Sequence, residues 1–411
     1  MNRKKVYLIG VGMGSESSLT KEAIDILSQV PVVIGARRMI QSFQNTSIWI
    51  TREEMGNQPE VYVEYHSLEI ADYIKGLEQF PVAILLSGDV GFCSGAKKLL
   101  KALEFCEVMM LPGITTVAYL ASRFNLSWDD MNLTSLHGTA NAIVNRVHHN
   151  AYTFALLGGK DSVNQLCNLL MEYGMEQVKL HVGECLSYPS EKIQTISPLE
   201  GYMGGQQELA AVIIENPNPC NEISSSIDDD DFIRGKVPMT KAEVREVSIS
   251  KLKLTKDAIC YDVGAGTGSI GIEIACKSTD IQVYAIEKNS EAVDLIEQNK
   301  RKFRVDNLSV VEGLAPQALE SLPAPTHVFI GGTTGNLESI VYAIWEKNPT
   351  VRIVLNAIAL ETVAQAVDFE KKHPELQSEV VQLYVSKSRT LGGYHMMTGQ
   401  NPIYIITWQK P

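Results

Sequence analysis

One glycine-rich segment of the sequence contains the residue types that hold a nucleoside. The run Asp262-Val-Gly-Ala-Gly-Thr-Gly268 follows the apolar stretch 258–263, and Glu287 ends the next apolar stretch. Glycines let backbone amides approach a ligand because no side chain intervenes, and a carboxylate at Glu287 can accept hydrogen bonds from both hydroxyls of a ribose. The segment therefore predicts a nucleoside site made by Asp262, Gly264, Ala265, Gly266, Thr267, Gly268 and Glu287.

The same loop also contains Gly266-Thr-Gly-Ser-Ile-Gly271, which has the spacing of a dinucleotide-binding loop. Its register argues against a dinucleotide, because the strand should end at Val263 and Gly271 then falls inside the following helix. A pyrophosphate also needs free amides at the helix N-terminus, where the carboxylate of Asp262 would repel it. Asp262 suits the cationic amino group of a methionine moiety, so we expect S-adenosylmethionine here. A dinucleotide, or a turn without a ligand, is the alternative.

Further glycine-containing loops follow apolar stretches in the N-terminal half. Because ligands bind α/β sheets at the carboxyl ends of the strands, loops that meet at that edge predict a cleft for a small ligand. Taken alone, Gly10-Val-Gly-Met-Gly14 is equally well explained as a tight turn. The other loops of this kind are Ser87-Gly-Asp-Val-Gly-Phe92, Pro112-Gly-Ile-Thr-Thr116, Ser135-Leu-His-Gly138 and Leu157-Gly-Gly159.

The elements around these loops predict two α/β domains. With 411 residues the chain is too long for one hydrophobic core, and short apolar runs alternate with helical patterns in both halves. Residues 217–227 are rich in proline and serine, which predicts a linker between a domain at 1–216 and another at 228–411. The four aspartates 228–231 are then interpreted as a solvated linker end and not as a metal site.

Two apolar runs near the C-terminus predict how the second sheet ends. Residues 380–385 and 402–407 fit an antiparallel pair at the sheet edge. Between them, Ser386-Lys-Ser-Arg-Thr-Leu-Gly-Gly393 is polar and glycine-rich, which indicates a loop that serves as a lid. In the first domain, Thr20 is expected to cap a helix over residues 22–27.

Composition argues against several classes of protein. A net charge of −12 disfavours wide nucleic-acid binding, which needs a basic face. The seven cysteines form no CxxC pair, so we expect free thiols, with neither disulfides nor a zinc site. Apolar stretches are too short for a membrane span or a signal peptide, which predicts a cytoplasmic protein.

In their order, these motifs resemble a known enzyme family over nearly the whole chain. The first half, with Gly-Asp-x-Gly-Phe from Gly88 and Ser-Leu-His-Gly from Ser135, resembles the tetrapyrrole methylases, and among them the precorrin C5-methyltransferases. The second half, with Pro238-Met-Thr-Lys-Ala-Glu-Val-Arg245 and the glycine loop, resembles the decarboxylating precorrin C15-methyltransferases. Together the halves resemble the fused precorrin C5,15-methyltransferases of cobalamin biosynthesis.

The resemblance implies a fold and a set of reactions. The fold would be a tetrapyrrole-methylase domain, with two α/β subdomains and a cleft, followed by a Rossmann-like class I methyltransferase domain. The first domain would methylate C5 of a precorrin or cobalt-precorrin. The second would methylate C15 and decarboxylate the C12 acetate, and each domain would hold its own S-adenosylmethionine. The family also suggests homo-oligomers. Another porphyrinoid substrate, or corrinoid binding without turnover, is the alternative.

The resemblance also carries site residues over to this chain. In the second domain, Thr240 and Ala315 join the glycine loop and Glu287 as cofactor contacts. Cys93 departs from the aromatic residue that relatives often have near the first pocket. The cofactor contacts implied for the first domain are Gly88, Asp89, Phe92, Thr115, Thr116 and Leu157.

Methyl transfer to carbon depends mostly on positioning an electron-rich carbon against the sulfonium methyl. Glu361, Tyr394 and His395 are candidate acceptors for the proton lost afterwards, with a structural role as the alternative for each. His148 and His149 are expected on a helix surface. The residues that could bind the carboxylates of the substrate, or else form a solvated rim, are Arg234, Lys236, Lys241, Arg245, Lys387, Arg389 and Thr390.

Overall fold

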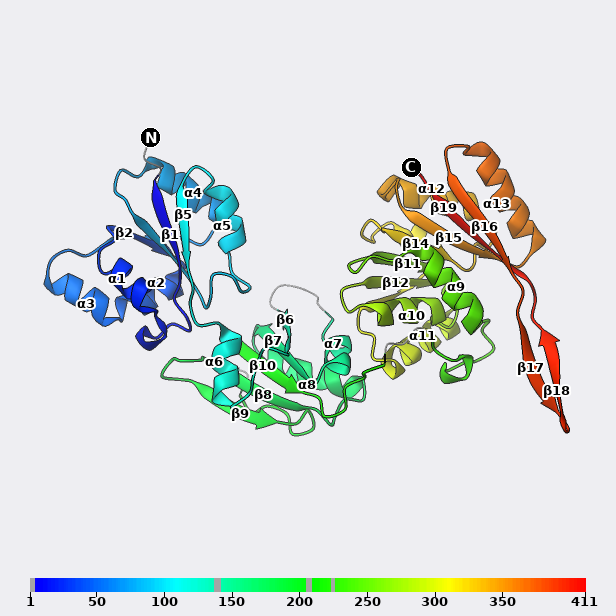
Figure 1. Cartoon of the computed structure of the whole chain (residues 1–411), viewed down its shortest axis with the longest axis horizontal. Coiled ribbons are helices and arrows are strands. Elements are labelled where there is room, and N and C mark those ends of the chain that lie inside the picture. The colour runs from blue at the N-terminus through cyan, green and yellow to red at the C-terminus, as the bar shows by residue number, and fades with distance from the viewer. Residues whose placement is uncertain (1–3, 137–141, 205–208, 223–225) are drawn as a thin grey trace. The chain divides into compact units, whose positions relative to one another are not determined.

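The computed structural model describes residues 4–136, 142–204, 209–222 and 226–411 (Figure 1). The chain forms two compact units. The first comprises Met1–Thr139, Asn150–Asn168 and Glu176–Pro217, and the second comprises Ala140–His149, Leu169–Met175 and Asn218–Pro411. Among the described helices, none is both long and apolar enough to cross a membrane.

The first unit begins with a parallel sheet in the order β3-β2-β4-β1-β5. Helices cover both faces, because Leu8 of β1 packs in one core with α4 and α5, and Ile9 packs in another with α1 and α2. Thr20 accepts a hydrogen bond from the N–H of Ala23 and caps α1, as predicted. The elements are β1 (Lys5–Gly10), η1 (Glu16–Ser18), α1 (Lys21–Leu27), β2 (Val32–Gly35), α2 (Arg37–Gln44), α3 (Ser47–Glu54), β3 (Glu60–Val63), α4 (Ser67–Gly76), β4 (Val82–Leu86), α5 (Ala96–Ala102) and β5 (Glu107–Leu111).

A second sheet in the same unit has the order β6-β7-β10-β8-β9, in which β6 and β7 are parallel and the other pairs antiparallel. The predicted pair of α/β subdomains is therefore confirmed. The elements are α6 (Thr116–Arg123), β6 (Asn132–Ser135), β7 (Tyr152–Gly158), α8 (Ser162–Glu172), β8 (Lys179–Glu184), β9 (Lys192–Ile196) and β10 (Leu209–Glu215). The last residues of α8, from Leu169, belong to the second unit.

The second unit is built on a seven-stranded sheet in the order β13-β12-β11-β14-β15-β19-β16. The first five strands are parallel, and β19 and β16 form the predicted antiparallel pair at the edge. Helices α9, α10 and α11 cover one face, and α12 and α13 cover the other. The elements are η2 (Asp229–Asp231), α9 (Ala242–Leu252), β11 (Ile259–Val263), α10 (Ser269–Lys277), β12 (Gln282–Glu287), α11 (Ser290–Lys302), β13 (Leu308–Glu312), η3 (Gln317–Leu319), β14 (His327–Ile330), α12 (Leu337–Lys347), β15 (Arg352–Ala357), α13 (Leu360–Lys372), β16 (Gln377–Leu383) and β19 (Ile403–Gln409).

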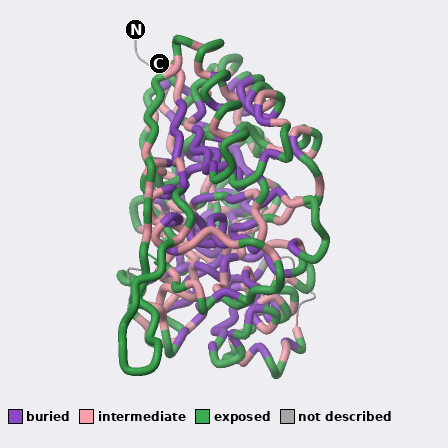
Figure 2. Tube along the Cα trace, turned by 90° about the vertical axis from the view of Figure 1, so that its right-hand side faces the viewer, coloured by how far each residue is buried: buried purple, intermediate pink, exposed green. Residues whose placement is uncertain are grey.

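The polar segment predicted as a loop forms a β-hairpin instead. Strands β17 (Ser386–Leu391) and β18 (Tyr394–Gly399) pair antiparallel, and every residue in both strands is exposed (Figure 2). The two glycines between them make the turn, with Gly392 at a φ of 60°. A two-residue Gly-Gly connection is a typical hairpin turn, so the loop prediction was wrong because the two glycines were interpreted as part of a lid loop and not as the turn between two strands.

A short helix from the N-terminal half of the sequence belongs to the second unit. Helix α7 (Val144–His149) begins at the carboxylate of Asp306, which accepts hydrogen bonds from the N–H groups of Ile143, Val144 and Asn145 at 2.7–2.9 Å. These amides have no partner within the helix, so the carboxylate acts as its N-terminal cap. The second unit therefore includes residues that precede the predicted linker at 217–227 in the sequence.

We expect the replacement of Gly113 by alanine to destabilise the first unit. An added Cβ would lie 2.3 Å from the carbonyl oxygen of Gly88 and 2.5 Å from that of Gly10, and backbone atoms cannot rotate away. The free energy of unfolding in urea should fall by about 1–3 kcal/mol. Gly76→Ala is the control, since nothing lies within 4 Å of its added Cβ. Equal urea midpoints for the two variants would contradict this close approach of the three loops.

Candidate active site

A cavity of ≈ 780 Å³ opens at the carboxyl ends of the parallel strands in the second unit. Its wall includes the ends of β11, β12 and β14 and the segment 236–241, which precedes α9. Strand ends of an α/β sheet are the usual place for a ligand. Six of the predicted cofactor contacts line it: Thr240, Gly264, Ala265, Gly266, Glu287 and Ala315.

The turn after β11 needs its glycines. Gly264, Gly266 and Gly268 have φ values of 73°, 58° and 78°, in the left-handed region. An added Cβ on Gly264 would lie 2.8 Å from the nitrogen of Gly332, and one on Gly266 would lie 2.9 Å from the carbonyl oxygen of Pro238. Helix α10 starts at Ser269, so Gly271 lies inside it, as the register predicted.

Glu287 joins the glycine loop to the start of α11. One carboxylate oxygen accepts the N–H of Gly266 at 2.9 Å, and the other accepts the N–H groups of Lys288 and Asn289 at 2.8 and 3.0 Å. The oxygen that accepts only the N–H of Gly266 has a further lone pair. The side chain is therefore held at the cavity wall with the capacity to accept a hydrogen bond from a ribose.

Asp262 lies behind the loop and not on the cavity wall. Its side chain is 1% exposed, and Oδ2 accepts the N–H of Gly271 at 2.8 Å. Burial raises the pKa of Asp262 to about 7. Thr267 and Gly268 also lie outside the set of residues that line the cavity. The geometry does not support direct contact of Asp262 with the amino group of a ligand, and gives the carboxylate the role of bracing α10.

Arg245 was predicted as a substrate-binding residue, and this prediction was wrong. Its side chain is fully buried, with Nε 2.8 Å from Glu273 and Nη1 2.7 Å from Asp229. Nη1 also donates to the carbonyl oxygen of Thr240 at 2.6 Å, and Nη2 donates to that of Ile227. Four of the five N–H donors of the guanidinium have partners inside the protein, and the fully buried side chain is closed to a substrate carboxylate.

The run of aspartates is also not a solvated linker end throughout. Asp229 lies in η2 and accepts the N–H of Ala242 at 3.0 Å, besides its ion pair with Arg245. Although burial opposes ionisation, the hydrogen bond and charge of Arg245 hold the pKa of Asp229 below its usual value. Burial raises the pKa of Glu273 against the attraction of the same guanidinium. The sequence did not indicate these roles of Asp229 and Glu273, because their partner Arg245 is distant from both in the sequence.

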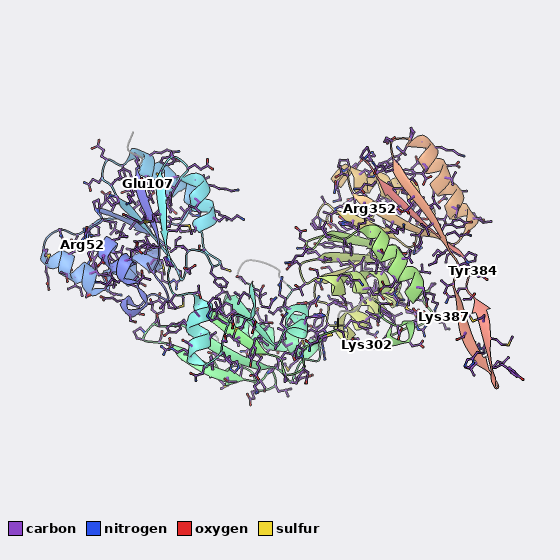
Figure 3. All side chains as sticks on the ribbon, in the orientation of Figure 1. Arg52, Glu107, Lys302, Arg352, Tyr384 and Lys387 are labelled. Carbon is purple, nitrogen blue, oxygen red and sulfur yellow. The ribbon has the colours of Figure 1, made fainter. Side chains whose placement is uncertain are left out.

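The other predicted cations fall into two groups. Lys236 and Lys241 line the cavity. Arg234 is exposed and pairs with Asp230 at 2.7 Å, outside the cavity. Lys387 at the base of the hairpin pairs with Glu243 at 2.7 Å (Figure 3). Arg389 and Thr390 are exposed farther along the hairpin and do not line the cavity.

The three candidate proton acceptors do not meet in the cavity. Glu361 is exposed in the first turn of α13. Tyr394 is 78% exposed on β18, and His395 is exposed beside it. Lining residues that the sequence did not single out as site residues include Lys288, Asn289, Gly331, Gln400 and Asn401. Lys288 and Gly331 follow the ends of β12 and β14 directly, which was a usable signal.

The first unit has a cavity of ≈ 310 Å³ between its two sheets. Five predicted contacts line it: Gly88, Asp89, Phe92, Thr116 and Leu157. Thr115 does not, because its hydroxyl caps α6 by accepting the N–H of Ala118. Cys93 and Ser135 also line this cavity, while His137 and Gly138 lie outside the described residues.

The carboxylate of Asp89 ties two loops of this cavity together. Oδ1 accepts the N–H of Gly91 at 2.7 Å, and Oδ2 accepts the N–H of Gly113 at 3.0 Å. Arg38 reaches the rim, where it donates to the hydroxyl of Ser87 at 3.2 Å. The predicted convergence of strand-end loops on one cleft is therefore present in the structure.

Comparison with known proteins gives these cavities a family. The model for Tetrapyrrole (Corrin/Porphyrin) Methylases matches residues 5–200, and that for the Precorrin methyltransferase domain matches residues 231–410. The precorrin-6Y C(5,15)-methyltransferase [decarboxylating] of a Sinorhizobium species is 28% identical to this chain, in an alignment that covers 98% of this chain and 96% of that protein. The probable cobalt-precorrin-6B C(15)-methyltransferase (decarboxylating) of Pyrobaculum aerophilum is 40% identical to this chain, in an alignment that covers 44% of this chain and 94% of that protein. The chain belongs to the precorrin C5,15-methyltransferase family.

Membership of this family confirms the predicted class of protein, an S-adenosylmethionine-dependent methyltransferase of cobalamin biosynthesis. It also confirms the order of a tetrapyrrole methylase half and a second methyltransferase half. Among solved structures, a precorrin-6Y C5,15-methyltransferase from Geobacter metallireducens is 40% identical, covering 45% of this chain and 96% of its own, with a TM-score of 0.43.

We expect Arg245→Ala to destabilise the second unit by about 3–5 kcal/mol, because it leaves the carboxylates of Asp229 and Glu273 buried without a counter-charge. Arg234→Ala, which removes an exposed ion pair, is the control and should cost about 1 kcal/mol or less. Thermal and urea unfolding measure both. A folded, equally stable Arg245→Ala protein that only loses substrate affinity would restore the substrate-binding interpretation.

Asp262 should make stability depend on pH. Because its pKa rises from 3.8 to about 7 on folding, its contribution is fully present below pH 3.8 and is lost as the pH rises toward 7. Asp262→Asn removes this titration and keeps an oxygen that can accept the N–H of Gly271. The urea midpoint of the variant, relative to the unaltered chain, should therefore rise between about pH 4 and 8. A difference that is constant with pH would be evidence against a buried, raised Asp262.

Proposed function

We propose that this chain methylates C5 and C15 of a precorrin ring and decarboxylates the acetate side chain at C12. The observation that carries the proposal is the presence of two cavities, one in each unit, both at the carboxyl ends of parallel strands. The relative that matches nearly the whole chain is named for methylation at these two ring positions and for decarboxylation.

The two reactions are divided between the domains predicted at 1–216 and 228–411, each with its own S-adenosylmethionine. The match of the second half to separate C(15)-methyltransferases that decarboxylate supports C15 chemistry in the cavity beside Glu287. C5 methylation then belongs to the cavity beside Asp89. In both cavities a carboxylate fixes the loops, which supports a nucleoside cofactor at each.

The residues of the second cavity act mainly by positioning. The glycine loop and Glu287 would hold the cofactor, which would supply a sulfonium methyl to a carbon nucleophile aligned with it. Loss of carbon dioxide from the C12 acetate leaves an electron pair that is conjugated to C15. C15 can then act as the carbon nucleophile toward the sulfonium methyl. Lys236, Lys241 and Lys288 on the wall offer ammonium groups to the carboxylates of the ring.

Mass spectrometry of the reaction products tests the proposal. Incubation of precorrin-6B, and separately of its cobalt form, with the chain and S-adenosylmethionine should give a product with two added methyl groups and without one carbon dioxide. Methylation of a different porphyrinoid alone, or tight corrinoid binding without turnover, would reject the proposal in favour of those alternatives.

Glu287→Ala should abolish C15 methylation and decarboxylation while sparing C5 methylation. The change removes the acceptor for the ribose hydroxyls and frees the N–H of Gly266. Glu312→Ala is the matched control, since Glu312 ends the neighbouring strand in register with Glu287 and does not line the cavity. Product masses read all three events at once. Survival of C15 methylation in Glu287→Ala would contradict the assignment of this cavity.

The same proposal includes a homo-oligomer. Leu391, Tyr394, Met396 and Met397 on the β17–β18 hairpin are each more than half exposed. Apolar side chains gathered on one projecting element are typical of a subunit contact. Light scattering of the full chain should give more than one chain per particle, and Met396→Ser with Met397→Ser should shift the mass toward a single chain.

A further inference from the structure

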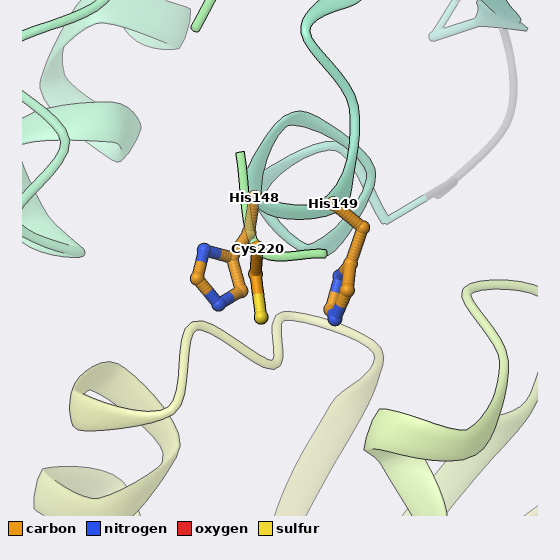
Figure 4. Close-up of side chains that lie close together, drawn as sticks. All are labelled: His148, His149 and Cys220. Atoms are coloured by element: carbon orange, nitrogen blue, oxygen red, sulfur yellow. The ribbon is translucent and has the colours of Figure 1, made fainter. Parts of the chain in front are cut away.

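Three side chains outside both cavities lie close enough together to share a metal ion. They are His148, His149 and Cys220, whose ligand atoms all lie within 4.8 Å of one another. The two histidines end helix α7, Cys220 lies between β10 and η2, and all three belong to the second unit. In Figure 4 the sulfur lies between the two imidazole rings, and the three side chains point the same way. We propose that this cluster binds one zinc ion.

The backbone already holds two of the ligands in place. Nδ1 of His149 lies 2.9 Å from the carbonyl oxygen of Asn145 and, as the donor, leaves Nε2 with a free lone pair. A histidine that binds a metal usually donates its other ring N–H in this manner. The N–H of Cys220 donates to the carbonyl oxygen of His148 at 2.8 Å, which ties the thiol to the end of the helix.

His148 needs one rearrangement before it can bind an ion. Arg304 donates to Nδ1 of its ring at 3.3 Å. For Nε2 to bind an ion, the ring proton moves to Nδ1 and Arg304 gives up this contact. Its two hydrogen bonds to the carbonyl oxygens of Tyr173 and Gly174 can remain.

Two imidazole nitrogens and one thiolate match the donor preference of zinc, which is tetrahedral with Zn–N near ~2.0–2.1 Å and Zn–S near ~2.3 Å. These bond lengths place neighbouring ligand atoms about 3.3–3.6 Å apart, so the ligand atoms need to move toward one another by about 1 Å to bind the ion. The thiol of Cys220 releases its proton to solvent as the sulfur binds, and a water occupies the fourth position. The ion would fasten the first residues after Pro217 to α7.

Metal binding to the full, reduced chain tests this site. After chelator treatment and addition of zinc, elemental analysis should find one tightly held ion per chain, and cobalt in its place should give the visible bands of a tetrahedral thiolate complex. Cys220→Ser and His149→Gln should each weaken zinc binding by at least about 100-fold, since even outer partners of a zinc ligand are worth about 10–100-fold. Zinc should also raise the thermal midpoint of the unaltered chain and not that of Cys220→Ser.

Two variants control for loss of a thiol or an imidazole elsewhere. Cys185→Ser removes a partly exposed thiol in the first unit, and His66→Gln removes an exposed imidazole next to Glu64. Both should bind zinc as the unaltered chain does. Circular dichroism checks that each variant is folded. The proposal is overturned if the unaltered chain retains no zinc, or if folded Cys220→Ser and His149→Gln bind it with unchanged affinity.

Discussion

The buried guanidinium of Arg245 holds together the part of the second unit on which its cavity depends. One side chain pairs with Asp229 and Glu273 and donates to the carbonyl oxygens of Ile227 and Thr240. The segment between those two carbonyls contains the wall that faces the glycine loop. Both ends of the wall are thus attached to one cation, which is itself braced against α10 through Glu273. Loss of these hydrogen bonds would free the segment that forms the cavity wall opposite the glycine loop.

Among its described residues, the first unit shapes its cavity by backbone contacts and a carboxylate that accepts backbone amides. There, the backbones at Gly10, Gly88 and Gly113 touch so closely that no side chain fits between them, and Asp89 joins two of the loops through backbone amides. Backbone contact of this kind is rigid and does not depend on ionisation. The two halves of one enzyme therefore shape their cavities by different means, which agrees with their separate family matches.

Features set by local sequence were predictable, and features set by distant partners were not. The strand ending at Val263, the glycine loop and the place of Gly271 inside the next helix follow from apolar runs and glycine spacing. The cap at Thr20 and the edge pair of strands also follow from local residue types. Arg245 looked like a rim cation because nothing within its own helix reveals Glu273, 28 residues away.

The same limit applies to smaller errors at the site. Thr115 and Thr116 are equivalent in a motif, yet one hydroxyl is used to cap α6 and only the other lines the cavity. Gln400 and Asn401 reach the second cavity because β18 returns the chain to β19 there, which no spacing rule anticipates. Residues that line a cavity from such crossing segments become visible only once the strand order is known.

The capping of α7 by Asp306 has a consequence for how the two activities can be inherited. Burial raises the pKa of Asp306 even though three amides hydrogen-bond to it. Splitting the gene at the linker would send the helix to one product and its capping carboxylate to the other. In one product, the first N–H groups of α7 would lose the carboxylate that accepts their hydrogen bonds. In the other, Asp306 would lose the three N–H groups that donate to it. Fission into two independent proteins therefore requires new residues at this contact as well as a new stop and start.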